Sequence, residues 1–80
     1  MATRGALRTA EEHGIKLADL IRRHVAGDWG DLDPHDRRVN EEAVQWGNRI
    51  LSAYGEGDAK LWIITEADRS STCVLRPDEY

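Results

Sequence analysis

The sequence predicts an α+β domain, with about three N-terminal helices followed by a three-stranded antiparallel β-meander. Three observations support this fold class. Apolar residues recur at helical spacing before residue 47, runs of β-branched and aromatic residues follow, and only short polar connections separate those runs. Strands joined by short turns pair antiparallel, and the helices are then expected to cover one face of the sheet. With 80 residues, the chain is expected to form a single domain spanning residues 1–80.

Two helices are expected before Gly27. Thr3 is placed to cap a helix over Arg4–His13, and Gly14 follows at the position where helices commonly end in a left-handed residue. A second helix is expected from Lys16 to Val25, with Gly27 as its stop. Four apolar residues are expected to form one side of this helix: Leu17, Leu20, Ile21 and Val25.

A third helix is expected after a loop over Gly27–Leu32, because two glycines and two aspartates there disfavour helix. Asp33 suits the N-cap, Pro34 suits the first helical position, and Asp36 places negative charge in the first turn. The helix is expected to run to about Trp46, where Gly47 closes it. Three of its residues are expected to point inward: Val39, Ala43 and Trp46.

The remainder of the chain predicts strands over Arg49–Tyr54, Lys60–Glu66 and Ser71–Arg76, the last halted by Pro77. The middle strand is apolar on both sides, with Leu61 and Ile63 on one and Trp62 and Ile64 on the other. Two interpretations stay open at this point. Either the helices and tail wrap round the second side as extra core, or that side is a contact surface of a homodimer or a partner-binding sheet.

Composition excludes several classes of protein. The chain has 11 Lys and Arg against 15 Asp and Glu, a net charge of −4 and a pI near 5.2, so direct nucleic-acid binding is not expected. Mean hydropathy is −0.64 and no long apolar stretch exists, so neither a membrane partner nor a secretory signal is expected. A single cysteine excludes an internal disulfide framework. We therefore expect a soluble, cytoplasmic protein.

The sequence offers little for catalysis, and we expect no enzyme, no metal and no cofactor. Cys73 lies within a predicted strand, where a packed thiol is expected rather than a nucleophile. Glu41 and Glu42 are adjacent on a helix and point apart. The histidines show no metal-ligand spacing and are expected at the surface near helix ends: His13, His24 and His35.

An acidic segment around Trp29 is the strongest candidate for binding. Asp28, Asp31 and Asp36 can dock on an arginine-lined groove while an exposed Trp29 anchors the contact. The structural alternative is that Trp29 folds back onto the core and that Asp33 and Asp36 only cap and charge the helix.

A second polar cluster is expected on the last hairpin turn. Its candidate binding residues are Glu66, Asp68 and Arg69. The structural alternative here is a local ion pair between Arg69 and its acidic neighbours.

Four segments resemble, in order, the motifs of a family of small bacterial proteins carried on plasmids, phages and integrated elements. Arg23–Leu32 contains GDWGDL, Arg49–Tyr54 is similar to GRLLSAY, Leu61–Ser70 contains WIITEADRS, and Leu75–Tyr80 is similar to LLPEEY. The family is commonly described as plasmid-related proteins or, loosely, as type I restriction subunits.

Some short members of this family resemble anti-CRISPR proteins directed at the type I-C surveillance complex. The resemblance implies a non-enzymatic inhibitor that acts in the cytoplasm of a bacterial host. It would bind subunits of the CRISPR effector complex and block recognition of target DNA. The sheet alternatives given above allow either a monomer or a homodimer. The alternative is an accessory protein of a plasmid or restriction locus that binds another protein partner.

Overall fold

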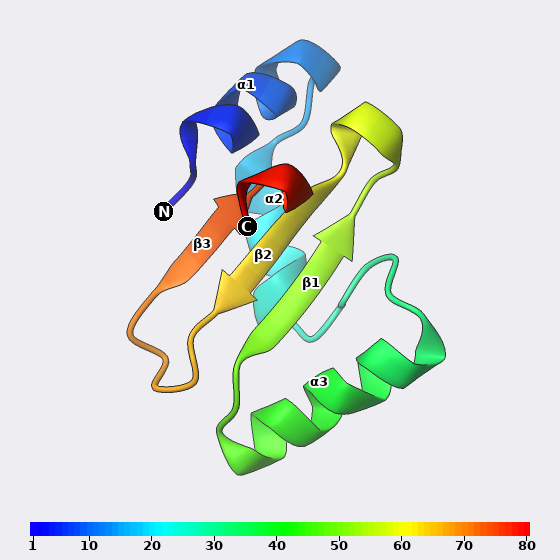
Figure 1. The fold of residues 1–80 in the computed structure, drawn as a ribbon, viewed down its shortest axis with the longest axis vertical. Helices are drawn as coiled ribbons and strands as arrows, with labels where there is room; N and C mark the ends of the chain where they lie inside the picture. Colours follow the sequence, from blue (N-terminus) through cyan, green and yellow to red (C-terminus); the bar gives the residue numbers. More distant parts are fainter.

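A computed structural model describes all 80 residues and confirms the α+β arrangement (Figure 1). Three helices come first and a three-stranded antiparallel sheet follows in the order β1-β2-β3. The elements are α1 (Arg4–His13), α2 (Leu17–Val25), α3 (Pro34–Trp46), β1 (Ile50–Tyr54), η1 (Gly57–Ala59), β2 (Leu61–Thr65), β3 (Thr72–Leu75) and η2 (Pro77–Glu79).

The helix ends follow the local signals in the sequence. The Thr3 side chain accepts a hydrogen bond from the Ala6 N–H at 3.1 Å and so caps α1. Asp33 caps α3 in the same way through the Asp36 N–H at 2.8 Å. Gly14 and Gly47 close α1 and α3 in the left-handed conformation. These predicted boundaries are therefore confirmed.

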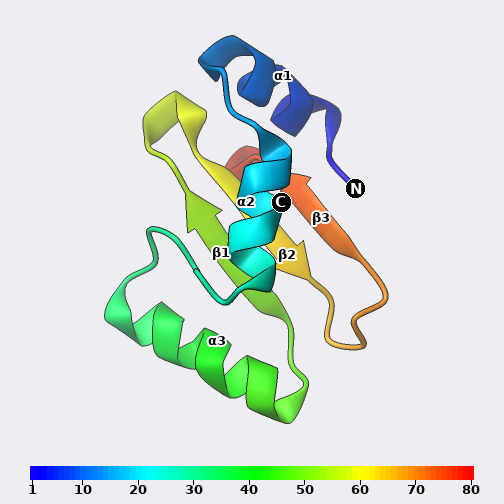
Figure 2. The ribbon, with the colours of Figure 1, turned by 180° about the vertical axis from the view of Figure 1, so that it is seen from behind.

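The sheet presents two faces, set by a register that aligns Ser52, Ile63 and Val74 across the three strands. We call the face that carries these residues the covered face, because α2 crosses it (Figure 2). We call the opposite side the open face. Its strand residues are Leu51, Ala53, Trp62, Ile64, Cys73 and Leu75.

The main core lies between the covered face and the first two helices. Tyr54, Leu61, Ile63 and Val74 are almost fully buried there together with Ala6 of α1. Hydrophobic side chains of α2 and of the short connection before it pack against this cluster: Ile15, Leu17, Leu20 and Ile21. A second, smaller core joins α3 to β1 and contains Trp29, Ala43 and Ile50.

Both edges of the sheet are occupied by other parts of the chain. Along β3, the first residues pair in parallel, with Thr3 N–H donating to the Val74 carbonyl at 2.9 Å and Val74 N–H donating to Met1 at 2.8 Å. Along β1, the Asn40 side chain of α3 hydrogen-bonds both the N–H (3.1 Å) and the carbonyl of Leu51. A further strand therefore has no free edge to join.

Three expected inward positions are wrong. Val25 of α2 is 78% exposed, and Val39 and Trp46 of α3 are 48% and 71% exposed. On α3 the inward side consists of Asn40 and Ala43, because the helix lies along a strand edge. Such an edge offers backbone groups that an amide can bond and room only for a small side chain. Apolar character alone did not identify this side.

The alternatives for the open face are also clarified by the fold. No helix crosses this face, and only η2 and the chain end lie over part of it (Figure 1). Tyr80 packs edge-on against Trp62, with ring centroids 5.9 Å apart. The helices therefore do not wrap round the sheet.

Candidate functional site

The segment Gly27–Leu32, which we call the acidic loop, runs beside β1 as a short parallel pairing. Asp31 N–H donates to the Ala53 carbonyl at 2.7 Å, and Ala53 N–H donates to the Trp29 carbonyl at 3.2 Å. Gly30 sits between them at φ +76° with Tyr54 against its Cα. A Cβ at this position would overlap the Ala53 carbonyl oxygen and lie 2.6 Å from the Tyr54 ring. Only glycine therefore allows this close approach.

Trp29 lies inside the protein. Its side chain is 5% exposed, meets the His24 ring edge-on at 6.0 Å between centroids, and donates from Nε1 to the Glu41 carboxylate at 2.9 Å. The expectation of an exposed tryptophan anchor is wrong, and the alternative that Trp29 folds back onto the core is confirmed. The indole N–H finds a partner on α3, so burial leaves no unsatisfied donor.

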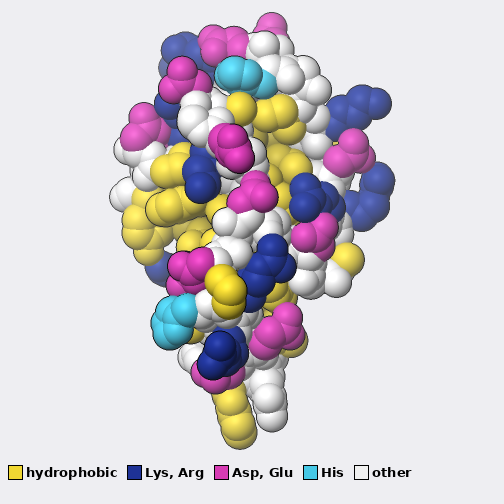
Figure 3. All heavy atoms as spheres, turned by 90° about the vertical axis from the view of Figure 1, so that its right-hand side faces the viewer, with side chains coloured by type: hydrophobic (Ala, Val, Ile, Leu, Met, Phe, Trp, Pro, Cys, Tyr) yellow, Lys and Arg dark blue, Asp and Glu magenta, His cyan; other side chains and the backbone are white.

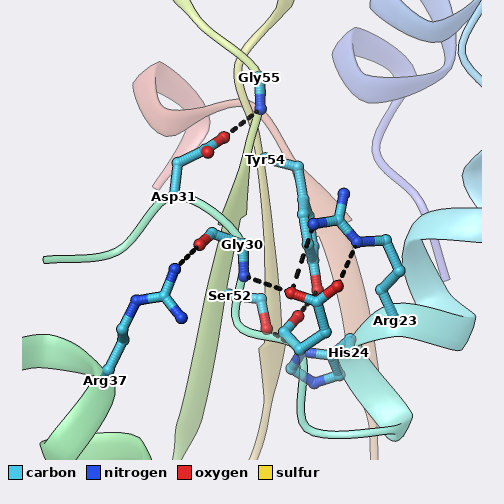
Figure 4. A network of polar contacts seen from close by, with 9 residues as sticks. Arg23, His24, Gly30, Asp31, Arg37, Ser52, Tyr54 and Gly55 are labelled. Atoms are coloured by element: carbon cyan, nitrogen blue, oxygen red, sulfur yellow. Dashed lines mark hydrogen bonds and ion pairs between the residues drawn. The ribbon is translucent and has the colours of Figure 1, made fainter. Parts of the chain in front are cut away.

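Asp28 is held by three neighbours, Arg23, Gly30 and Tyr54, which are labelled in Figure 4. Its carboxylate accepts two hydrogen bonds from Arg23, at 2.7 and 3.3 Å, and one from the Gly30 N–H at 3.2 Å. The hydrogen bond from Arg23 is the main cause that lowers the pKa of Asp28 below its ordinary value. Its carbonyl accepts the Tyr54 hydroxyl at 2.6 Å. Asp28 therefore fixes the loop while its carboxylate stays at the surface.

Asp31 and Asp36 keep carboxylate oxygens available to solvent. Asp31 is exposed and accepts a hydrogen bond from the Gly55 N–H at 2.9 Å through only one oxygen (Figure 4). The exposed Asp36 carboxylate has no hydrogen-bond or ion-pair partner in the chain. Arg37 donates hydrogen bonds to the carbonyls on both sides of Asp31, those of Gly30 and of Leu32, the latter at 2.9 Å.

The last hairpin turn is not held by the expected ion pair between Arg69 and its acidic neighbours. Arg69 makes no salt bridge with its acidic neighbours, and that expectation is wrong. Its guanidinium donates instead to backbone carbonyls, including Asn48 at 2.7 Å and Ala43 at 3.1 Å. Glu66 pairs with Arg49 at 3.2 Å. Arg69 therefore joins the turn to the C-terminal end of α3, where free carbonyls need donors.

Asp68 shapes the same turn. Its carboxylate accepts the Ser70 N–H at 3.0 Å, and hydrogen bonds from Ser70 lower the pKa of Asp68. The two predicted clusters stand at opposite ends of β1, since Asp31 bonds to Gly55 after the strand and Arg69 bonds to Asn48 before it.

His24 is a buried residue that sequence reasoning placed at the surface, so that expectation is wrong. It is 5% exposed, with Nδ1 2.5 Å from Ser52 Oγ and Nε2 2.8 Å from Thr65 Oγ1. Thr65 continues the network to Thr72 at 2.9 Å. Burial lowers the pKa of His24. One signal was present: His24 follows Ile21 by three residues, which continues the inward stripe of α2.

Comparisons with protein-family models, with curated proteins and with solved structures give no match for this chain. Its site is therefore interpreted from its own geometry. No three His, Cys, Asp or Glu side chains lie close enough together to hold a metal ion. None of the helices has the length and hydrophobicity that a membrane span requires.

Proposed function

We propose that this protein is a non-enzymatic inhibitor that binds the type I-C CRISPR effector complex of a bacterial host and blocks recognition of target DNA. The sequence motifs described above provide the class of target. The observation that supports the mode of action is the rigid presentation of the acidic loop. Asp28 and Asp31 are each hydrogen-bonded to the framework and yet exposed.

Rigid presentation matters because a loop that is already ordered loses little conformational entropy when it binds. Effector surfaces that hold DNA carry arginine and lysine side chains, and carboxylates at fixed positions can occupy them. Trp29 acts in this proposal as a positioning residue, because its burial between α3 and β1 supports the backbone that carries Asp28.

The charge distribution favours a local contact over imitation of a DNA duplex. Net charge is only −4, and acidic and basic side chains are interspersed on the surface seen in Figure 3. Asp28, Asp31 and Asp36 form the primary contact in this proposal. A secondary contact in this proposal lies at the other end of β1 and consists of the turn residues Glu66, Asp68 and Arg69. The two contacts are about 17 Å apart, the length of a five-residue strand.

The first test is phage survival on a host with active type I-C immunity, with and without this protein. Rescue of a targeted phage, with no effect on an untargeted phage, supports the proposal. The variant Asp31→Lys with Asp36→Lys should lose that rescue. The matched control is Glu11→Lys with Glu12→Lys, which changes the net charge equally on exposed positions of α1.

A failure of rescue with abundant folded protein would overturn the CRISPR proposal. Copurification then addresses the alternative function, an accessory protein of a plasmid or restriction locus that binds another protein. An effector inhibitor should comigrate with the purified effector complex and leave free duplex DNA unshifted. Because the contact is electrostatic, binding should weaken as salt rises.

A further inference from the structure

The covered face of the sheet is not filled at the end where α2 stops. A pocket of about 370 Å³ lies there, between the C-terminal ends of α2 and α3 (Figure 2). Its floor is the last row of the face, in which the register aligns Ile50, Thr65 and Thr72 across the three strands. Val25 of α2 and Val44 of α3 belong to its wall and are 78% and 54% exposed. The volume is within the range of small-molecule sites.

A chain of hydrogen bonds ends in this pocket. His24 Nε2 lies 2.8 Å from Thr65 Oγ1, which lies 2.9 Å from Thr72 Oγ1. His24 and Thr65 are both buried, whereas Thr72 is only partly buried and its side chain makes no other hydrogen bond in the protein. The Thr72 hydroxyl is therefore the group of this chain that can bond to a molecule in the pocket.

The direction of these hydrogen bonds depends on the tautomer of the neutral His24 ring. With the proton on Nε2, His24 donates to Thr65, Thr65 donates to Thr72, and the Thr72 hydroxyl hydrogen is free to donate into the pocket. With the proton on Nδ1, both bonds are reversed, and Thr72 offers only lone pairs. A negatively charged ligand therefore requires the first tautomer.

Arg69 supplies a positive charge to the same pocket. It makes no ion pair, and it donates to backbone carbonyls through Nη1 and Nη2 while its Nε makes no hydrogen bond in the protein. Two carboxylates from the surrounding elements are already occupied, since Glu66 pairs with Arg49 and Glu41 accepts the Trp29 N–H. An unpaired guanidinium beside a hydroxyl donor suits a carboxylate ligand.

We propose that this pocket binds a small monocarboxylic acid with an apolar body. The body would lie against Val25, Val44 and Ile50, and the carboxylate would accept hydrogen bonds from Arg69 and Thr72. Burial of the body stabilises the complex, and the charge-assisted hydrogen bonds fix its orientation. The site uses none of the acidic-loop carboxylates, so the inference does not rest on the proposed inhibitor function.

The test is an NMR titration of the full ¹⁵N-labelled chain with 2-naphthoate at constant ionic strength. It is performed at about pH 7.5, above the pKa of His24, which burial lowers. The dissociation constant should be on the order of 1 mM for a probe of this size, with amide shifts centred on Val25, Val44 and Thr72. 2-Naphthamide has the same body without the charge and should bind at least about tenfold more weakly.

Two variants probe the site and one serves as control. Val44→Glu should weaken naphthoate binding at least about fivefold, because it places a carboxylate in the wall of the pocket. Val39→Glu is the matched control, since Val39 is exposed to a similar extent on the same helix but does not line the pocket, and it should bind like the unmodified chain. Thr72→Val removes the hydroxyl with little change in shape and should also weaken binding. Circular dichroism checks that each variant is folded.

Equal binding of naphthoate and naphthamide would overturn this proposal, as would an absence of shifts at about 10 mM probe or equal losses in Val44→Glu and Val39→Glu. The ¹⁵N shifts of the His24 ring give a further readout. The bound form should carry a proton on Nε2, and a bound form without it would contradict donation by Thr72. The titration contains no effector complex, so its outcome is separate from that of the phage assay.

Discussion

The two faces of the sheet both carry apolar residues, yet different elements pack against them. The covered face receives α2 and contains Leu61 and Ile63 at 0% exposure, together with the hydrogen-bonded His24. The open face receives only the short η2 and Tyr80. A chain of 80 residues has enough helix to cover one face and the strand edges. The second apolar face therefore has no helix packed across it.

Two neighbouring isoleucines on β2, one on each face, test whether the two faces differ in packing. Ile63→Ala should lower the free energy of unfolding by about 4 kcal/mol, because the cavity lies in the enclosed core of the covered face. Ile64→Ala should cost about 2 kcal/mol, since the open face can relax around the missing atoms. Urea denaturation at low micromolar concentration measures both. Equal losses would contradict the difference between the faces.

The acidic loop covers part of the β1 edge. Alanine substitutions at two glycines, one in this loop and one outside it, test how closely the loop packs against the strand. Gly30→Ala should lower the free energy of unfolding by about 3 kcal/mol, because the new Cβ would overlap the Ala53 carbonyl at a positive φ. Gly14→Ala, at φ +66° with no atom near its Cβ, should cost about 1 kcal/mol. Thermal melts compare the two, and a similar loss in both would show that the loop is loosely held.

Protonation of His24 probes the polar part of the covered face and has the smallest effect. Burial holds the pKa of His24 in the folded state below the value of about 6.5 expected when unfolded. Between these two values the unfolded chain binds more protons. The free energy of unfolding should thus fall as pH decreases below about 6.5, by at most about 1.4 kcal/mol per pH unit, and level off below the folded pKa.

Substitutions assign this pH dependence to one residue. His24→Gln should remove it, whereas His35→Gln, on the exposed first turn of α3, should retain it. Denaturant titrations between pH 7.5 and about 5 measure the slope, and they stay above the range in which carboxylates such as Asp28 titrate. A slope that survives His24→Gln would contradict the assignment.

Local signals were sufficient for the elements of this fold. Thr3 and Asp33 cap helices through their own side chains, Gly14 closes α1, and the run Leu61–Thr65 forms the central strand. These signals act within a few residues, where sequence neighbours are also spatial neighbours. The number, type and order of the α-helices and strands could therefore be predicted, whereas the short 3₁₀ helices η1 and η2 were not.

The candidate site was less predictable, because its residues depend on partners far along the chain. Asp28 and Asp31 were recognised as an acidic pair, but their fixed positions depend on Tyr54 at the end of β1 and on Gly55, which follows that strand. Trp29 is buried against Ala43 and Ile50, and Glu41 of α3 accepts its N–H. No local pattern contains these pairings.

The sequence by itself determined the α+β class, the boundaries of the helices and strands to within about one residue, and the presence of a strand that is apolar on both sides. Only the tertiary structure decided which side of that strand the helices cover. It also decided that His24 rather than Val25 faces inward and that Trp46 stays outside. The physical reason is that hydrophobicity favours burial without specifying a partner, whereas hydrogen bonds to Ser52 and Thr65 require one particular packing.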